Sequence, residues 1–79
     1  MSPVVFRKRG YRAYFFAQEE LRLHVHLRHE TGEAKFWLEP QIELARNHGL
    51  SAARVAVALQ LVREYQDEIR GAWKAFFSR

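Results

Sequence analysis

Leu21-Arg22-Leu23-His24-Val25-His26-Leu27-Arg28, residues 21–28 of the chain, alternate apolar and basic side chains without exception. Strict alternation is the period of a β-strand that buries one face and leaves the other open to solvent. We therefore expect a strand over residues 21–29. Its open face would carry Arg22, His24, His26 and Arg28, the polar group of this sequence that most suggests chemistry.

The composition predicts one small domain, residues 1–79, with a packed core. The chain has 79 residues, of which 48% are hydrophobic and 14% aromatic, well above the values of disordered segments. In so short a chain, burial only modestly exceeds the entropy cost of folding. A second copy of the chain would add stability, and a homodimer is one of the assemblies that we consider.

Cysteine usage, apolar runs and charge restrict the class of protein. The chain has no cysteine, which excludes a disulfide scaffold, a thiolate metal site and a cysteine nucleophile. No apolar run approaches the roughly 18 residues of a membrane span, and the start lacks the apolar segment of a signal peptide. We expect a cytoplasmic protein that uses no membrane, no cofactor and no metal. The net charge of +4 favours nucleic acid or an acidic protein as partner.

Two hairpins are expected to form most of the sheet. Arg9-Gly10 would turn the chain between a strand that begins at Val4 and a strand over residues 11–17, and Thr31-Gly32 would turn it between residues 21–29 and 34–38. These turns predict the cross-strand pairs Val4 with Phe15, Val5 with Tyr14, Phe6 with Ala13, Arg7 with Arg12, Val25 with Leu38, His26 with Trp37, Leu27 with Phe36 and Arg28 with Lys35.

The second half of the chain changes period. Residues 42–48 alternate weakly and favour a short fifth strand over a helical turn. Ser51 is a good N-cap, and apolar residues then recur three and four apart through a helical part, 50–78. An unbroken helix of this length would span about 42 Å, so it must bend, break near residues 65–67, or overhang and pack on a second subunit. The fold class is α+β, with the sheet part over residues 1–48 covered on one face by the helical part.

The predicted registers divide the strand residues between two faces. The core face carries Val4, Phe6, Ala13, Phe15, Leu23, Val25, Leu27, Phe36 and Leu38. The other face, which we expect to be open, carries Arg7, Arg12, Tyr14, Phe16, Arg22, His24, His26, Arg28, Lys35 and Trp37. Aromatic side chains gathered on an open face usually mark a contact surface.

Three interpretations compete for this open face. It could pack against another copy of the chain or against residues 42–48. It could bind a single-stranded nucleic acid through stacking and phosphate contacts, although no RNP-type motif is present. It could use His24 and His26 as an acid and a base, or as two metal ligands with a third from Glu39, His29 or His48.

Several motifs, taken in order, resemble one bacterial family. They are Pro3-Val4 at a strand start, Gly10 before an aromatic-rich strand, His24-x-His26, the run from Gly32 to Pro40 (Gly-Glu-Ala-Lys-Phe-Trp-Leu-Glu-Pro), Glu43-Leu44-Ala45-Arg46-Asn47, and Gly49-Leu50-Ser51 at a helix start. Over nearly the whole chain they resemble the bacterial domain of unknown function 4160 family. One departure is Leu23, which stands where the family commonly has proline.

The resemblance implies a small bacterial or archaeal protein that belongs to a toxin and antitoxin gene pair and has no established catalytic residues. The family's motif positions fall on His24, His26, Lys35, Trp37, Arg46 and Asn47. Most of these positions lie on the face that the strand pattern also singles out.

Together these observations predict a non-enzymatic interaction module, one half of a toxin and antitoxin pair, that binds its cognate protein partner or nucleic acid. The predicted binding residues are Arg7, Arg12, Tyr14, Arg22, His24, His26, Arg28, Lys35, Trp37, Arg46 and Asn47. The alternative is a small ribonuclease-like toxin, in which His24 and His26 act as acid and base while Arg28 and Lys35 hold the phosphate.

Overall fold

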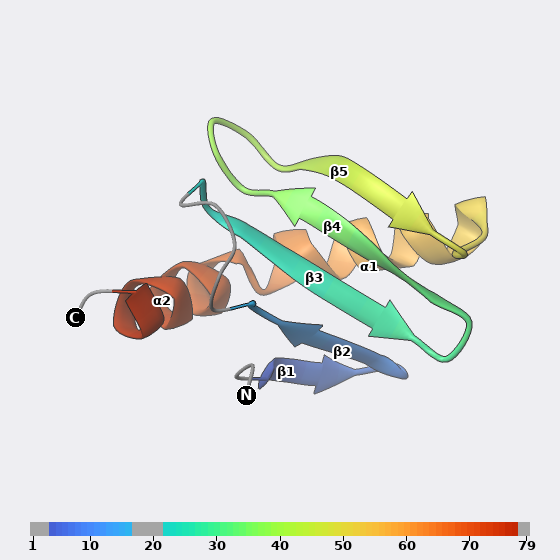
Figure 1. Ribbon diagram of the computed structural model, residues 1–79, viewed down its shortest axis with the longest axis horizontal. Helices are drawn as coiled ribbons and strands as arrows, with labels where there is room; N and C mark the ends of the chain where they lie inside the picture. The colour runs from blue at the N-terminus through green and yellow to red at the C-terminus, as the bar shows by residue number, and fades with distance from the viewer. Residues whose placement is uncertain (1–3, 17–21, 78–79) are drawn as a thin grey trace.

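The computed structural model describes residues 4–16 and 22–77. It shows an antiparallel sheet in the order β1-β2-β3-β4-β5, followed by two helices (Figure 1). The elements are β1 (Val4–Lys8), β2 (Tyr11–Tyr14), β3 (His24–His29), β4 (Gly32–Trp37), β5 (Glu43–His48), α1 (Ala52–Glu64) and α2 (Gln66–Phe77). The predicted α+β fold is confirmed, and residues 43–48 form the fifth strand. The predicted outer ends of two strands, Ala17 and Leu21, lie outside the described residues.

Both helices lie on one side of the sheet. Figure 1 shows α1 running behind the strands and α2 continuing toward the end where β2 finishes and β3 begins. The core between the layers is formed by wholly buried side chains from both, including Val25, Leu27, Phe36, Val62 and Ile69. The opposite side of the sheet, which we call the polar face, is turned toward the viewer.

The helical region breaks where the sequence suggested. Tyr65 has φ −105° and ψ 17°, and its N–H still donates to the Leu61 carbonyl, so it ends α1 before α2 begins at Gln66. The Tyr65 ring stacks on Phe6 of β1, with 4.4 Å between the ring centroids. The break therefore packs onto the edge strand. At the other end of α1, the Ser51 side chain accepts from the Arg54 N–H, which confirms the N-cap.

The first hairpin keeps only part of its predicted register. Arg9 and Gly10 both have positive φ, at 53° and 84°, as a type I′ hairpin turn requires. Two of the expected pairs, Phe6 with Ala13 and Arg7 with Arg12, are present. The predicted pairs of Val4 and Val5 are wrong, because a bulge leaves Val5 unpaired and sets Val4 opposite Tyr14. Val4 is consequently 44% exposed, while Val5 packs against the core.

The second hairpin is shifted by two residues from the predicted register. The pairs are Val25 with Phe36, His26 with Lys35, Leu27 with Ala34 and Arg28 with Glu33. A shift of two keeps every side chain on its predicted face, since strand side chains alternate with a period of two. Gly32 is not a turn residue: a Cβ there would collide with the His48 carbonyl oxygen, so glycine allows the close approach of β5.

A second bulge lies in β5. Arg46 pairs with Lys35 and Leu44 with Phe36, which leaves Ala45 as the extra residue. Strict alternation would have put Arg46 on the same side as Leu44, facing the helices. The bulge instead places Arg46 on the polar face.

Within the described part of the chain, neither helix is long and apolar enough to cross a membrane.

Candidate functional site

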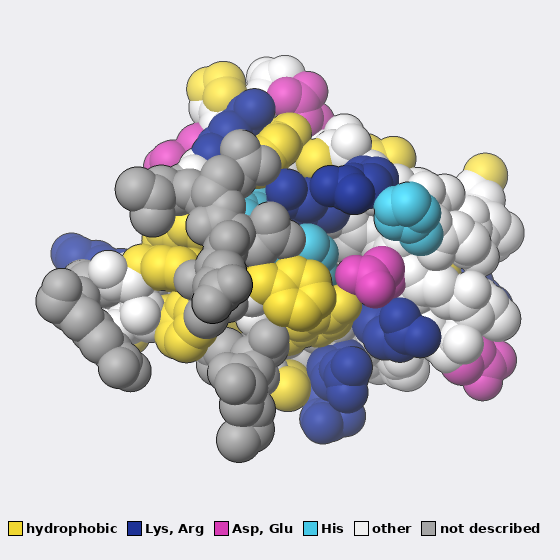
Figure 2. All heavy atoms as spheres, viewed as in Figure 1, with side chains coloured by type: hydrophobic (Ala, Val, Ile, Leu, Met, Phe, Trp, Pro, Cys, Tyr) yellow, Lys and Arg dark blue, Asp and Glu magenta, His cyan; other side chains and the backbone are white. Residues whose placement is uncertain are grey.

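Two parallel rows of side chains cross the polar face from strand to strand. The arginine row consists of Arg7, Arg12, Arg28, Glu33 and His48, each paired with the next across β1 to β5. The lysine row consists of Tyr14, His26, Lys35 and Arg46, paired in the same way across β2 to β5. Figure 2 shows basic, histidine and acidic side chains gathered on this side of the molecule. The register therefore brings together residues that are far apart in the sequence.

The arginine row places like charges directly opposite each other. Arg12 lies between Arg7 and Arg28, its cross-strand partners on both sides, and all three side chains are exposed. Like charges in directly opposed positions destabilise a sheet. The acidic member of the row is Glu33, which is 3.3 Å from the Arg28 guanidinium.

Glu33 connects the two rows. Its Oε2 accepts a hydrogen bond of 2.7 Å from the Tyr14 hydroxyl and lies 3.7 Å from Nδ1 of His26. Burial raises the pKa of Tyr14 above its usual value, and the hydrogen bond to the Glu33 carboxylate and its negative charge add to the rise. Glu33 was not among the predicted site residues. A turn centred on Glu30-Thr31 would have revealed it, because that register sets Glu33 opposite Arg28.

The expectation that His24 and His26 are open to solvent is wrong. His24 is wholly buried and His26 is 6% exposed. The His24 ring lies 5.1 Å from that of Trp73 in α2 and 5.7 Å from that of Trp37, measured between centroids. Its Nδ1 is 2.6 Å from the Arg22 carbonyl oxygen, and since a carbonyl only accepts, Nδ1 carries the proton and donates. His24 is thus buried at the end of the polar face, against Trp73 of α2.

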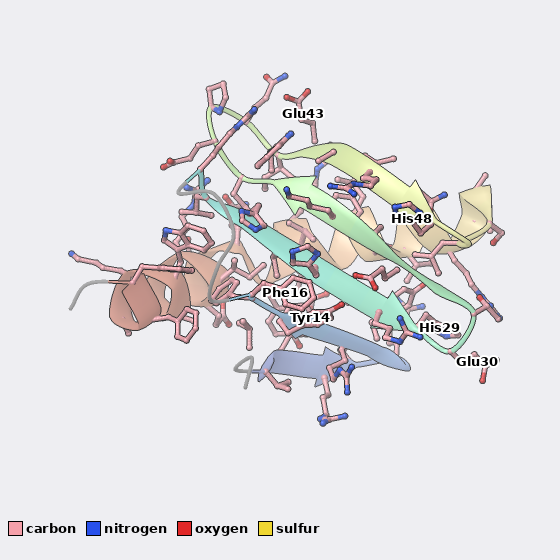
Figure 3. All side chains as sticks on the ribbon, in the orientation of Figure 1. Tyr14, Phe16, His29, Glu30, Glu43 and His48 are labelled. Carbon is pink, nitrogen blue, oxygen red and sulfur yellow. The ribbon has the colours of Figure 1, made fainter. Side chains whose placement is uncertain are left out.

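His26 belongs to the lysine row and lies between two aromatic rings. Its ring stacks on Tyr14 with 5.4 Å between centroids, and Phe16 meets it edge-on at 4.7 Å. Phe16 itself is 41% exposed. Figure 3 shows Phe16 and Tyr14 side by side at the end of β2, with His48 on the far strand. Phe16 is the exposed aromatic ring beside the two rows.

Trp37 is engaged by two cations. The Arg22 guanidinium lies 4.1 Å from the centre of a Trp37 ring and the Lys35 ammonium 4.5 Å from it. Arg22 also donates to the Glu39 carbonyl at 2.9 Å and lies 3.7 Å from a Glu43 carboxylate oxygen. These contacts hold Arg22 and Trp37 at the end of the polar face, beyond the two rows.

Two of the pockets on the polar face adjoin Phe16. The first, of about 230 Å³, is lined by Phe16, His26, Glu33, Lys35, Arg46 and His48. The second, of about 440 Å³, is lined by Val4, Arg12, Tyr14, Phe16, Arg28 and Glu33. Phe16 and Glu33 border both, so the two pockets are neighbours. The first pocket gathers cations of the lysine row, and the second gathers arginines of the arginine row.

The polar face includes ten of the eleven predicted binding residues. The rows contain Arg7, Arg12, Tyr14, His26, Arg28, Lys35 and Arg46, and the adjoining end contains Arg22, His24 and Trp37. The eleventh is Asn47, which pairs with Ala34 on the core side and whose amide both donates to and accepts from the Leu50 backbone. Asn47 thus stabilises the turn into α1.

No grouping of three or more histidine, aspartate or glutamate side chains suited to a metal ion occurs among residues 4–16 and 22–77. The three candidate third ligands do not form such a group with His24 and His26. Glu39 accepts from Arg70, His29 packs against Tyr11, and His48 is paired with Glu33. Among the described residues, the two rows offer basic side chains around the Glu33 carboxylate, with the exposed ring of Phe16 beside them. Such a set suits binding of an anion.

The chain was compared with families and with individual proteins. A family model described as "Domain of unknown function (DUF4160)" matches residues 10–74. No curated protein and no solved structure matches the chain. The matched region runs from the first hairpin turn into α2 and includes both rows except Arg7. The chain therefore belongs to the DUF4160 family, as the sequence motifs suggested.

Proposed function

We propose that this chain is a non-enzymatic interaction module whose polar face binds single-stranded nucleic acid through phosphate contacts. The observation that carries the proposal is the arginine row, in which Arg7, Arg12 and Arg28 stand opposite one another on adjacent strands. This arrangement costs folding free energy in the absence of an anion. A chain of phosphates bound along the row would neutralise these charges and remove the repulsion, which favours binding.

Phe16 favours nucleic acid over an acidic protein as the anionic partner. Its ring is 41% exposed and borders the pocket that contains Arg12 and Arg28. An aromatic side chain next to phosphate-binding arginines is the arrangement that stacks bases in proteins that bind single strands. Trp37, which the sequence also offered for stacking, is instead covered by Arg22 and Lys35.

A toxin and antitoxin pair is the setting we propose for this binding. It rests on the resemblance described for the sequence motifs, and nucleic-acid binding is compatible with either half of such a pair. The ribonuclease-like alternative needs His24 and His26 on either side of a phosphate. The burial of His24, together with the hydrogen bond from its Nδ1 to the Arg22 carbonyl, weighs against that pairing.

The test is a salt titration of binding to a fluorescent single-stranded RNA of about ten nucleotides. For single strands, log K falls with log salt with a slope of about −0.7 per phosphate contact. The double variant Arg7→Gln, Arg12→Gln is therefore expected to bind more weakly and to reduce the slope by about 1.4. The matched control, Arg63→Gln with Lys74→Gln, makes the same change of net charge on exposed helix positions and should bind as wild type does.

The same variants distinguish a functional role from a structural one. Since the substitutions remove like-charge repulsion, we expect the double variant to unfold at a urea concentration no lower than wild type. Wild-type RNA binding that is absent or independent of salt would refute the proposal. If an acidic protein instead bound wild type and not the double variant, the partner class would be protein.

A further inference from the structure

The larger of the two pockets beside Phe16 contains a carboxylate as well as arginines. Its volume is about 440 Å³, and its lining includes Arg12, Tyr14, Phe16, Arg28 and Glu33. This volume falls within the range of pockets that enclose small ligands. Figure 2 shows an acidic side chain on the polar face, between hydrophobic and basic side chains. Because a carboxylate repels phosphate, its presence in the pocket favours a ligand that also carries N–H donors.

Glu33 is held in place from two sides. Its Oε2 accepts from the Tyr14 hydroxyl at 2.7 Å, and its Oε1 accepts from Nη1 of Arg28 at 3.3 Å. Nδ1 of His26 lies 3.7 Å from Oε2, which is longer than a hydrogen bond. Each oxygen thus accepts one hydrogen bond within the described part of the chain, whereas a carboxylate has about four acceptor positions. The side chain is 27% exposed, so a ligand can reach it.

A base with two adjacent donors would use both oxygens of the carboxylate. Guanine presents its N1–H and its N2 amine side by side on the Watson–Crick edge. Adenine and cytosine each place a ring acceptor beside their amine, and uracil has a single N–H between two carbonyls. A carboxylate repels these acceptors, because it has no proton to offer them. The pocket therefore favours guanine over the other three bases.

Phe16 supplies a surface on which such a base would lie. Its ring is 41% exposed and borders the same pocket as Glu33. The ring meets Tyr14 edge-on, with 5.3 Å between the centroids, and Figure 3 shows the two side chains together at the end of β2. Stacking on an aromatic ring adds affinity for any base. Phe16 thus contributes binding, and Glu33 contributes the choice between bases.

From this geometry we propose that the pocket binds one guanine base of the strand, with the Glu33 carboxylate accepting from its N1–H and its N2 amine. The inference rests on the proposed function, because Arg12 and Arg28, which line the same pocket, would hold the adjacent phosphates. It adds a sequence preference to that function. The module selects single strands that contain an accessible guanine.

The experiment compares fluorescent oligouridine strands of about ten nucleotides that carry one guanosine, inosine or adenosine at the centre. We expect wild type to bind the guanosine strand at least about tenfold more tightly than the adenosine strand, as a bidentate contact to a base edge implies. Inosine lacks the N2 amine, so its strand should have an intermediate affinity. Glu33→Gln should reduce the guanosine-to-adenosine ratio below about twofold, because one amide oxygen replaces two acceptors and the amide N–H can donate to adenine.

Two variants serve as controls. Glu64→Gln makes the same charge change on the exposed surface of α1 and should keep the full ratio. Arg7 belongs to the arginine row but does not line this pocket. Arg7→Gln should therefore weaken binding of all three strands by a similar factor and keep the ratio. Circular dichroism checks that Glu33→Gln is folded, and the comparison of the three strands on wild type needs no variant.

The outcomes separate the guanine pocket from the proposed function. Equal binding of the guanosine and adenosine strands by wild type would overturn the pocket and leave the proposed function standing. A guanosine preference that persisted in folded Glu33→Gln would also overturn the pocket. If no strand bound but guanosine monophosphate bound wild type and not Glu33→Gln, the pocket would stand with a free nucleotide as its ligand, and the proposed function would fail. Absence of binding to every probe would overturn both.

Discussion

Replacing Tyr14 with phenylalanine should change how the stability of this protein depends on pH. The Tyr14 side chain is buried, and its hydroxyl donates to the Glu33 carboxylate at 2.7 Å. Burial, the hydrogen bond and the charge of Glu33 all raise the Tyr14 pKa above the ordinary value of 10.0. In the folded protein, Tyr14 therefore keeps its proton at pH values where the unfolded chain loses it.

The sign and size of the effect follow from proton linkage. Because the folded pKa is raised, the stability that the hydroxyl contributes is fully present below pH 10 and is lost as pH rises from there toward the folded pKa. A hydrogen bond to a charged group contributes about 1.5 to 3 kcal/mol, and the lower value applies because the Glu33 side chain is 27% exposed. At pH 11 the ionisation of the unfolded tyrosine removes about 1.4 kcal/mol.

Urea unfolding of wild type and Tyr14→Phe, measured at intervals between about pH 8 and pH 11, tests this expectation. Wild type should be more stable by about 1.5 kcal/mol at pH 8, and the difference should shrink to nearly zero at pH 11. Taking the difference between the two proteins cancels lysine and other tyrosine titrations that they share. The tyrosinate absorbance of the folded proteins supplies a second readout.

One result would refute the reasoning. If the free-energy difference between the two proteins stayed constant from pH 8 to pH 11, the folded pKa of Tyr14 could not be raised, and the hydroxyl would not be held by Glu33. The variant Glu33→Gln is the matched control. It keeps an acceptor oxygen but removes the charge, so its stability should fall less steeply above pH 10 than that of wild type.

Two further substitutions test the fold around the site. Gly32→Ala should lower the free energy of unfolding, measured in urea, by at least about 2 kcal/mol. The added methyl group meets the His48 carbonyl, which is part of the backbone and cannot rotate away. Stability equal to that of wild type would contradict the close approach of β4 and β5. Ser51→Ala should lower the free energy of unfolding by about 1 kcal/mol, and Ser51→Asn should restore it, since both side chains can accept from the Arg54 N–H.

The sequence predicted the two faces of the sheet better than it predicted the pairs within them. The face of a strand residue depends on alternation alone, and the second hairpin is displaced by two residues, which leaves alternation intact. Its exact register depended on the role of Gly32. A glycine next to a threonine suggests a turn, whereas here it makes room for the His48 carbonyl. That contact involves a strand that begins eleven residues later, so no local pattern reveals it.

Burial on the polar face was the other feature that the sequence did not predict. The alternation in residues 21–28 suggested solvent for His24, but the ring of Trp73 lies 5.1 Å from it. Trp73 comes from α2, and its position depends on the break at Tyr65. The local period of a strand cannot report a neighbour that arrives from 49 residues further along the chain. Arg7, Arg12 and Arg28, which no helix covers, were placed correctly.

The bulge at Ala45 has a consequence for comparing relatives of this protein. Ala45 of β5 has no cross-strand partner on β4. A chain that lacked Ala45 would therefore still set Arg46 opposite Lys35 and Leu44 opposite Phe36. A one-residue gap at this position would therefore keep both Lys35 and Arg46 on the polar face. In this strand, a deletion at the bulge thus leaves the faces of the neighbouring side chains unchanged.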